Sequence, residues 1–489
     1  MRIQVGSHVV SRPADCYPGP LWEPSEPRLV AVGGAAVFGA LVSCRSSPEL
    51  REFAGSYPAD ATPVGVTREF SLTAAPATVT LFDGRPLQVW AYNGQVPGPV
   101  LRVRLGETVR ATLTNRLPQP TTIHWHGVRV PNAMDGVPGV TQPAVQPGET
   151  FVYEFTPKDA GTFWFHPHVR ASEQVERGLF GVLVVEDVEP PPYSQDVVWV
   201  LDDWLLTSEG EIFPQFNTRH DLAHDGRWGN VVTVNGRTRE QLFVKAGERI
   251  RLRLLNVANG RVFRPDLSGL DAKVIAVDGM YAARPVDPVG FELAPGNRLD
   301  LDITVAANRG GQRVVVVDRF TQQPIPLAEI VVTDAVVATP DFASPARAHV
   351  PAWGNTRELA TRAEYRLDAR TGGPFGIQWT INGEAYDHAD HGARPRNMQT
   401  LPYGEWSKLR FANDSFRLHP MHIHGQFFKV LARNGERVEE PFWRDTVLLH
   451  AKETVDVGLV PQDRGTWMLH CHVLEHAESG MMTLVNVTN

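Results

Sequence analysis

Ten of the 17 histidines fall into a few short motifs, and these motifs hold the residues most able to do chemistry. Eight of the ten form four His-x-His pairs: His124 and His126, His166 and His168, His422 and His424, and His470 and His472. Residues i and i+2 of a β-strand point to the same face and lie ~6–7 Å apart. One such pair suits two neighbouring metal ions better than a single chelated ion. Eight imidazoles at one interface would therefore hold several close metals.

Cys471 indicates which metal this is. It lies between His470 and His472, so in a strand its thiolate points to the opposite face from both imidazoles. The other residues that could complete its ligand set are His419, His476 and Met481. Two imidazoles, a thiolate and a weak thioether form a blue-copper site, which cycles between two oxidation states. A zinc or copper storage protein is the main alternative, but storage needs no strand shared between sites.

The strand around Cys471 would connect a copper that accepts single electrons to a metal cluster on its other face. A single acceptor beside a cluster that stores several electrons suits the four-electron reduction of dioxygen to water. The reason is that release of partly reduced oxygen would be harmful. We therefore expect dioxygen to be the electron acceptor.

An internal repeat shows which elements must position these residues. A Gly-Glu pair precedes an alternating run that ends in Asn, eight positions after the Glu, at 106–115, 247–256 and 404–413. Each copy is typical of a turn followed by a half-buried strand. Nine residues after Asn115 and Asn413 come His124 and His422, whereas the middle copy has Pro265 at that position. The repeat predicts three copies of one β domain, of which only the first and third carry metal-type pairs.

The composition favours an all-β fold, because 39 Pro and 42 Gly separate short β-branched runs along the 489 residues. We expect a Greek-key sandwich or barrel in each copy. The predicted organisation is an N-terminal extension over 1–65 and domains over 66–188, 193–338 and 348–489. The net charge of −8 argues against nucleic acid as a partner.

Taken together, residues 66–489 resemble the multicopper oxidase family, which includes laccases, bilirubin oxidases and bacterial cuprous oxidases. The resemblance implies three cupredoxin domains and four copper ions: one type 1, one type 2 and a type 3 pair. It implies type 1 copper on His419, Cys471 and His476, with Met481 axial. It implies type 2 copper on His124 and His422, and the type 3 pair on His126, His166, His168, His424, His470 and His472.

Two acids are candidates for moving protons to oxygen. Family members often carry a carboxylate directly after the last type 1 His, but this chain has Ala477 there and Glu478 next. The other family acid is matched by Asp135. We predict Asp135 as the main proton donor, aided by Glu478. Without the resemblance, an Asp before Gly136 is more typical of a turn residue than of a catalytic acid.

Two further clusters contain potential ligands. The segment 386–391 gathers Tyr386, Asp387, His388, Asp390 and His391, and a second cluster holds His220, Asp221, His224 and Asp225. The first favours a solvated polar loop. The alternative for both is a labile metal site near the point of electron entry.

The N-terminus predicts export. An uncharged apolar stretch over 29–43 suits the core of a signal peptide. It ends at Cys44, which resembles a bacterial lipoprotein signal, so we expect a periplasmic or cell-surface protein with a lipid anchor as one option. An uncleaved anchor and an unlipidated signal peptide are the alternatives. We expect a monomer.

The function predicted from these features is that of a laccase-like oxidase acting on phenols, aromatic amines or low-valent metal ions such as Cu(I) and Fe(II). An edge-exposed type 1 His would explain such breadth. The alternative is a dedicated cuprous oxidase, which the chain supports weakly because its 8 Met form no cluster beyond Met481-Met482. A non-catalytic scaffold would have lost ligands, and a two-domain nitrite reductase does not fit three repeats.

Overall fold

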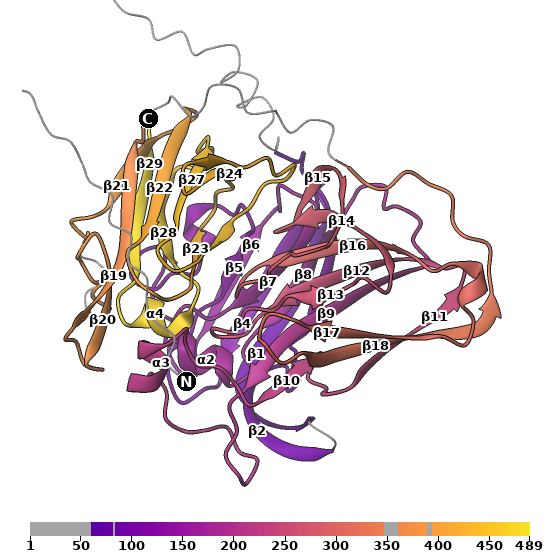
Figure 1. Ribbon diagram of the computed structural model, residues 1–489. Helices are drawn as coiled ribbons and strands as arrows, with labels where there is room; N and C mark the ends of the chain where they lie inside the picture. The colour runs from indigo at the N-terminus through magenta and orange to yellow at the C-terminus, as the bar shows by residue number, and fades with distance from the viewer. Residues whose placement is uncertain (1–59, 82–83, 347–359, 389–393) are drawn as a thin grey trace, which may run out of the picture. The chain divides into compact units, whose positions relative to one another are not determined.

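The computed structural model describes residues 60–81, 84–346, 360–388 and 394–489. The predicted signal segment over 29–44, including Cys44, lies outside these residues, as do Asp390 and His391. The regular secondary structure of the described chain is almost entirely β-strand (Figure 1), which confirms the all-β prediction. Within the described ranges, no helix combines the length and the apolar character needed to cross a membrane.

The first repeat forms two four-stranded sheets, ordered β2-β1-β4-β6 and β3-β8-β7-β5. Their strands are β1 (Thr67–Leu81), β2 (Arg85–Tyr92), β3 (Val100–Arg104), β4 (Thr108–Asn115), β5 (His124–His126), β6 (Thr150–Phe155), β7 (Gly161–His166) and β8 (Gly181–Glu186). A short 3-10 helix, η1 (Asn132–Met134), and helix α2 (Ala171–Glu176) lie in the connections.

The middle repeat forms sheets ordered β10-β9-β12-β16-β14-β15 and β11-β18-β17-β13. Its strands are β9 (Gln195–Trp204), β10 (Val231–Val234), β11 (Glu240–Ala246), β12 (Arg249–Asn256), β13 (Pro265–Asp266), β14 (Asp271–Val277), β15 (Met280–Val286), β16 (Arg298–Thr304), β17 (Arg313–Asp318) and β18 (Ile325–Val336). Helix α3 (Arg219–Ala223) and the 3-10 helix η2 (Ala307–Arg309) connect them.

The third repeat forms sheets ordered β20-β19-β22-β27-β24-β25 and β21-β29-β28-β23-β26. Its strands are β19 (Ala363–Thr371), β20 (Ile377–Ile381), β21 (Gln399–Pro402), β22 (Ser407–Asn413), β23 (His419–Ile423), β24 (Lys429–Arg433), β25 (Glu436–Arg437), β26 (Thr446–Leu449), β27 (Thr454–Leu459), β28 (Gly465–Cys471) and β29 (Met482–Thr488). Helix α4 (Leu474–Glu478) separates the last two strands.

The three repeats share one strand pairing. The repeated strands β4, β12 and β22 each pair in parallel with the first strand of their repeat and antiparallel with a later one. In the second sheet of each repeat, β5, β13 and β23 pair antiparallel with β7, β17 and β28. The middle repeat therefore has the same strands as the other two, with Pro265 opposite Asp318 where they place His opposite His.

The repeated Asn has the same structural role in each copy. The side-chain amide of Asn115 donates to two backbone carbonyls, and its oxygen accepts from the N–H two residues on. Asn256 and Asn413 make the same set of bonds. A buried amide with all these bonds fixes the corner after the strand. The corner then sets where the next strand, which carries the histidines, begins.

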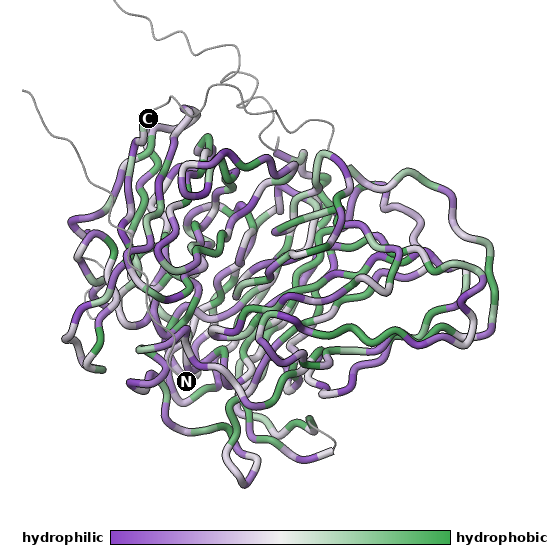
Figure 2. The backbone as a smooth tube through the Cα atoms, in the orientation of Figure 1, coloured by the Kyte–Doolittle hydropathy of each residue, from purple (hydrophilic) through white to green (hydrophobic). Residues whose placement is uncertain are grey.

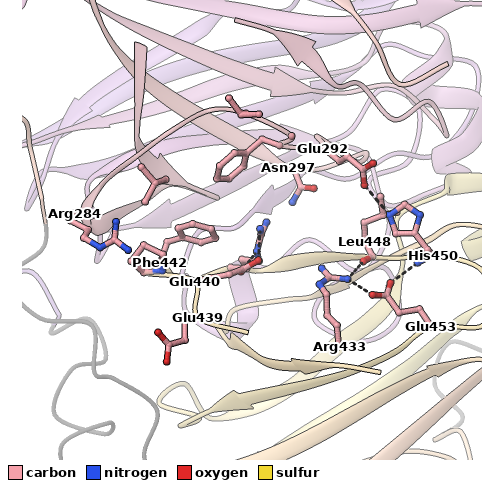
Figure 3. A pocket seen from close by; sticks show the side chains of 16 residues that line it. Arg284, Glu292, Asn297, Arg433, Glu439, Glu440, Phe442, Leu448, His450 and Glu453 are labelled. Atoms are coloured by element: carbon pink, nitrogen blue, oxygen red, sulfur yellow. Dashed lines mark hydrogen bonds and ion pairs between the residues drawn. The ribbon is translucent and has the colours of Figure 1, made fainter. Parts of the chain in front are cut away.

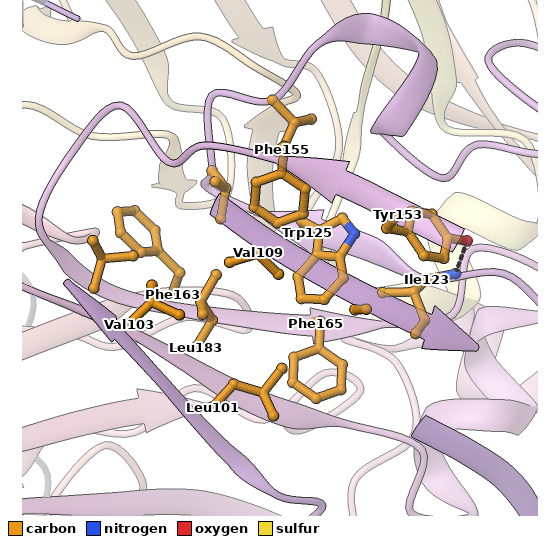
Figure 4. Packing of buried hydrophobic residues seen from close by; sticks show 14 of the residues in the cluster. Leu101, Val103, Val109, Ile123, Trp125, Tyr153, Phe155, Phe163, Phe165 and Leu183 are labelled. Atoms are coloured by element: carbon orange, nitrogen blue, oxygen red, sulfur yellow. Dashed lines mark hydrogen bonds between the residues drawn. The ribbon is translucent and has the colours of Figure 1, made fainter. Parts of the chain in front are cut away.

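Hydrophobic and hydrophilic residues alternate in short runs along the chain (Figure 2), as half-buried strands require. The alternation also orients the histidines. In β5, the indole of Trp125 lies in the core of the first repeat, with ring centroids 5.0 Å from Phe155 and 5.3 Å from Phe165 (Figure 4). His124 and His126 must then point to the opposite face of the strand.

Candidate metal centre

The four His-x-His pairs of the first and third repeats converge on one buried space. Register places His124 opposite His166 in the first repeat, and His422 opposite His470 in the third. Seven of the eight imidazoles are buried, and His168 is partly exposed. Rings from different repeats stack directly: the His124 and His424 centroids are 3.7 Å apart.

Three groups of three imidazoles form in this space, each with ligand nitrogens within 4.8 Å of one another. The groups are His124, His126 and His422; His126, His166 and His472; and His168, His424 and His470. Every group combines residues from the first and third repeats. The site therefore exists only where the two repeats meet.

The imidazoles fit a set of metal ions. Buried nitrogens without a hydrogen-bond partner include Nε2 of His124, His166 and His422, and both ring nitrogens of His472. A buried polar atom left unsatisfied costs ~1–3 kcal/mol, so a cluster of them indicates a missing partner. Nε2 of His424 lies 3.1 Å from Nε2 of His470 in the same group, a spacing that one metal ion bound to both rings would explain.

Backbone carbonyls fix the tautomers. Nδ1 of four rings donates to a main-chain oxygen at 2.8–3.0 Å: His124 to Asp135, His166 to Pro167, His422 to Asp445 and His470 to Cys471. These bonds place the proton on Nδ1 and turn the Nε2 lone pair towards the site. Burial lowers the pKa of His166, His422 and His470, which keeps them in the neutral form that binds metals.

A separate group contains His419, Cys471 and His476, all fully buried. Sγ of Cys471 lies 3.5 Å from Nδ1 of His419 and 3.9 Å from Nδ1 of His476. The two Nδ1 atoms are 3.2 Å apart. Burial raises the pKa of the Cys471 thiol and lowers that of His476 to about 3. One sulfur and two neutral imidazoles at this spacing suit copper.

Met481 lies next to this group through its backbone. Its carbonyl accepts from the N–H of Cys471 at 3.0 Å, and its own N–H donates to the carbonyl of His476 at 3.0 Å. The side chain is buried in the same core cluster as Cys471. The neighbouring Met482 packs in a different cluster.

The expectation of an edge-exposed type 1 His is wrong. Neither His419 nor His476 has exposed surface. The ring of Trp379 packs on both, with centroids 4.9 Å and 4.2 Å away, and Nε2 of His476 donates to the carbonyl of His224 at 2.7 Å. The rings are buried because the segment around α3, in the middle repeat, packs over them.

Asp135 contacts two of the imidazoles. It follows η1 and is buried, with one oxygen 2.8 Å from Nδ1 of His424 and the other 3.2 Å from Nδ1 of His124. The predicted proton donor therefore also orients rings from both repeats.

Glu478 lies at the end of α4 on a cavity of about 800 Å³ that also reaches His168. It accepts from the N–H of Ser172 at 3.2 Å and from the Ser172 hydroxyl. Burial raises the pKa of this carboxyl, which favours a protonated acid. The cavity thus brings an acid and the most exposed imidazole of the cluster to one space.

The described part of the 386–391 segment lines the same cavity. Tyr386 and His388 pack with ring centroids 5.3 Å apart, and Nε2 of His388 donates to the carbonyl of Ala477 at 3.3 Å. Among the described residues, no group of three potential ligands includes this segment.

Asp445 was not predicted from the sequence. Its side chain lies 3.3 Å from Nε2 of His126, and its carbonyl accepts from Nδ1 of His422. Arg298 of the middle repeat donates to both oxygens of Asp445, at 2.6 and 3.0 Å. Although burial acts to raise the pKa of Asp445, the guanidinium holds it below its usual value. The adjacent charged residues Arg444 and Asp445 within the otherwise mostly apolar run from Phe442 to Leu449 were the signal that could have drawn attention to it.

A cavity of about 490 Å³ between the second and third repeats is lined by Asn297, Phe442 and Leu448 (Figure 3). Asn297, in its wall, donates to the carbonyl of Thr446 at 3.1 Å and to Asp278 at 3.0 Å. The lining of this cavity also includes His450 and Glu292, which form an ion pair at 2.9 Å. The middle repeat, which carries no His-x-His pair, therefore supplies polar support for the cluster.

Known proteins share this arrangement. Three family models, each described as multicopper oxidase, match residues 73–190, 195–335 and 361–489. The multicopper oxidase MmcO of Mycobacterium tuberculosis is 30% identical, covering 92% of this chain and 94% of its own. Copper resistance protein A of Escherichia coli is 24% identical, covering 86% of this chain and 92% of its own.

The crystal structure of a multi-copper oxidase from Pseudomonas Thermotolerans is 34% identical and superposes with a TM-score of 0.75. It covers 86% of this chain and 100% of its own. These matches confirm the predicted family and its cupredoxin-like β fold. The chain belongs to the multicopper oxidase family of copper-dependent oxidoreductases.

Proposed function

We propose that the protein holds four copper ions and couples one-electron oxidation of its substrates to the four-electron reduction of dioxygen to water. The residues that would hold type 1 copper are His419, Cys471, His476 and Met481. Type 2 copper is held by His124 and His422. The type 3 pair is held by the groups His126, His166 and His472, and His168, His424 and His470, which fits their grouping in space.

One observation carries this proposal. Two adjacent residues, His470 and Cys471, belong to different ligand groups, and His472 belongs to a third. The His470 imidazole and the Cys471 thiolate leave opposite faces of β28, which ends at Cys471, so the peptide itself joins the two sites. Copper bound at these sites would supply one-electron redox chemistry and a place for dioxygen to be reduced.

The chain's own residues keep the imidazoles neutral and oriented. We call the type 2 copper and the type 3 pair together the trinuclear site. Asp445, which Arg298 holds in place, and Asp135 contact imidazoles of this site, and we do not assign either acid as a ligand. We propose that Asp135 supplies protons to the oxygen being reduced, aided by Glu478. The role of Glu478 in proton supply is supported by its position, because it lines the same cavity as His168.

The proposed substrates are phenols, aromatic amines and low-valent metal ions, as for a laccase-like enzyme. A dedicated cuprous oxidase is the second candidate. The complete burial of His419 and His476 favours it, because a bulky organic reductant has no exposed imidazole edge to approach.

The proposed location is periplasmic or on the cell surface, in a monomeric form, with a lipid on Cys44 as one mode of attachment. The support is the apolar stretch over 29–43 and the Cys that follows it. Mass spectrometry of the protein purified from membranes would reveal an N-terminal lipidated Cys44. A soluble mature form that begins elsewhere would refute the anchor.

Parallel oxygen-uptake assays with a phenol, Cu(I) and Fe(II) test the function. The copper-loaded protein should consume dioxygen with at least one of them. Apo-protein prepared with a chelator should consume none, and re-addition of copper should restore uptake. If uptake is the same in the apo-protein, the proposed function is wrong.

Replacing Gly296 with Ala should damage the trinuclear site from the middle repeat. Gly296 has φ +88°, and an added Cβ would lie 2.9 Å from Cε1 of His126 and 3.1 Å from Cδ2 of His472. The rings must shift, and misplacement of ~1 Å can cost about a hundredfold in rate. We expect lower type 3 copper content and slower dioxygen reduction, with the blue absorption retained.

Gly290→Ala is the matched control. It lies in the same repeat at φ +79°, and nothing lies within 4 Å of an added Cβ. It therefore reproduces the backbone strain without the contact. Equal loss of copper in both variants would show that the contact with the rings is not the cause.

A further inference from the structure

A segment of the middle repeat covers the type 1 ligand group. It runs from Thr218, the residue before α3, to Arg227, and we refer to residues 218–227 as the α3 cover. Nε2 of His476 donates to the carbonyl of His224 at 2.7 Å. The indole N–H of Trp379 donates to the carbonyl of Leu222 at 3.0 Å. The α3 cover therefore contacts the buried ligand ring directly and offers one route from it to solvent.

The α3 cover is held at several points. Asp225 accepts from the N–H of Leu418, next to His419, at 2.8 Å. The N–H of Arg227 donates to Glu475 at 3.1 Å. Thr218 and Asp221 form a reciprocal capping box that fixes the start of the helix. A segment fixed in this way keeps its outward side chains in constant position over the type 1 group.

Two of these outward side chains are His220 and His224. Both are exposed and have ring centroids 4.2 Å apart. His220 lies in α3, and His224, four residues on, is the residue that ends the helix. Nδ1 of His224 donates to the carbonyl of His220 at 2.8 Å. This bond leaves the Nε2 lone pair of His224 available to a metal. Two imidazoles at i and i+4 form a common metal-binding pair.

We propose that His220 and His224 bind substrate Cu(I) and form the point at which its electron enters the protein. This inference rests on the proposed function and specifies its substrate class. One electron leaves Cu(I), which becomes Cu(II) and dissociates. The electron passes through His224 and its carbonyl to the hydrogen-bonded ring of His476. Four such events supply the four electrons that dioxygen, with four protons, needs to form two waters.

The surroundings favour Cu(I) over Fe(II). Imidazole suits both copper and iron. Cu(I), however, accepts a low coordination number that two nitrogens can fill, whereas Fe(II) needs further ligands such as carboxylate oxygens. The nearby carboxylates are already engaged, Asp221 in the capping box and Asp225 with the N–H of Leu418. The imidazole pair is the remaining ligand set on the α3 cover.

Silver(I) binding to the copper-loaded full chain tests the site, because Ag(I) resembles Cu(I) but gives up no electron. Equilibrium dialysis followed by mass-spectrometric metal analysis should show Ag(I) retained by the wild type. The variant His220→Ala/His224→Ala should bind it about tenfold or more weakly. Arg219→Ala, exposed on the same helix, is the matched control and should bind Ag(I) like the wild type.

Anaerobic stopped-flow bleaching of the blue absorption tests the electron route. Reduction by a Cu(I) chelate should slow about tenfold in the double variant, while reduction by ferrocyanide should stay within about twofold. Retention of the His224 carbonyl in the variant leaves the bond to His476 in place. The blue absorption of the variant, unchanged before mixing, checks that the type 1 group is intact.

The outcomes separate the two proposals. If the wild type reduces no dioxygen with a phenol, Cu(I) or Fe(II), the proposed function is wrong. If it does, but the double variant binds Ag(I) and is reduced by Cu(I) as the wild type is, this inference alone is wrong. Equal slowing with both reductants would also overturn it, because the pair would then not be specific for Cu(I).

Discussion

Replacing Cys471 with Ser is expected to remove the intense blue absorption and to lower turnover with every reductant to background. The sulfur lies 3.5–3.9 Å from the two imidazoles of its group, and a hydroxyl cannot replace it as a soft ligand. Mutating a residue that only supports a metal ligand lowers metal affinity or activity ~10–100-fold, and loss of the ligand itself should lower activity further. Visible absorption and oxygen uptake of the copper-loaded variant measure both effects.

The same variant should keep its trinuclear copper, since Cys471 points away from that site. Metal analysis should therefore show the loss of one copper ion per chain. Met482→Leu is the control, because that buried residue packs in a different cluster from Cys471. A Cys471→Ser protein that stayed blue would refute the ligand assignment.

Replacing Asp135 with Asn is expected to slow dioxygen reduction by about a hundredfold or more, the usual effect of losing a general acid. The amide oxygen of Asn can still accept from Nδ1 of His424, where Asp135 now accepts at 2.8 Å. The ring should therefore stay in place while the proton is lost. Anaerobic reduction of the type 1 group should be intact, so stopped-flow traces with and without dioxygen separate the two steps.

Asp135→Ala provides the comparison, because it removes both the proton and the contact with His424. It should also lower the copper content of the trinuclear site, which Asp135→Asn should not. Glu478→Gln should have a smaller effect on dioxygen reduction. Unchanged turnover in Asp135→Asn would rule out its role as proton donor.

Short-range patterns predicted much of the fold. The Gly-Glu…Asn repeat predicted three β units because each Asn makes a local set of bonds that needs only nearby carbonyls. The i, i+2 spacing of the histidines predicted which side chains share a face. Strand pairing then places His124 opposite His166 and His422 opposite His470, and this brings the pairs of each repeat together.

Contacts between distant segments could not be predicted in this way. Asp445 and Arg298 are 147 positions apart, and neither belongs to a repeated motif. The α3 cover lies over His476 from 252 positions away, which is why the sequence wrongly suggested an exposed type 1 ring. Both depend on how the middle repeat packs against the third, which residue spacing does not encode.

The stoichiometry of oxygen uptake tests the central claim most directly, because only joined sites can deliver four electrons to one dioxygen. The copper-loaded chain is supplied with a limiting one-electron reductant while dioxygen and hydrogen peroxide are measured together. The account predicts four equivalents of reductant consumed per dioxygen, with no peroxide. Two equivalents per dioxygen with matching peroxide would contradict it.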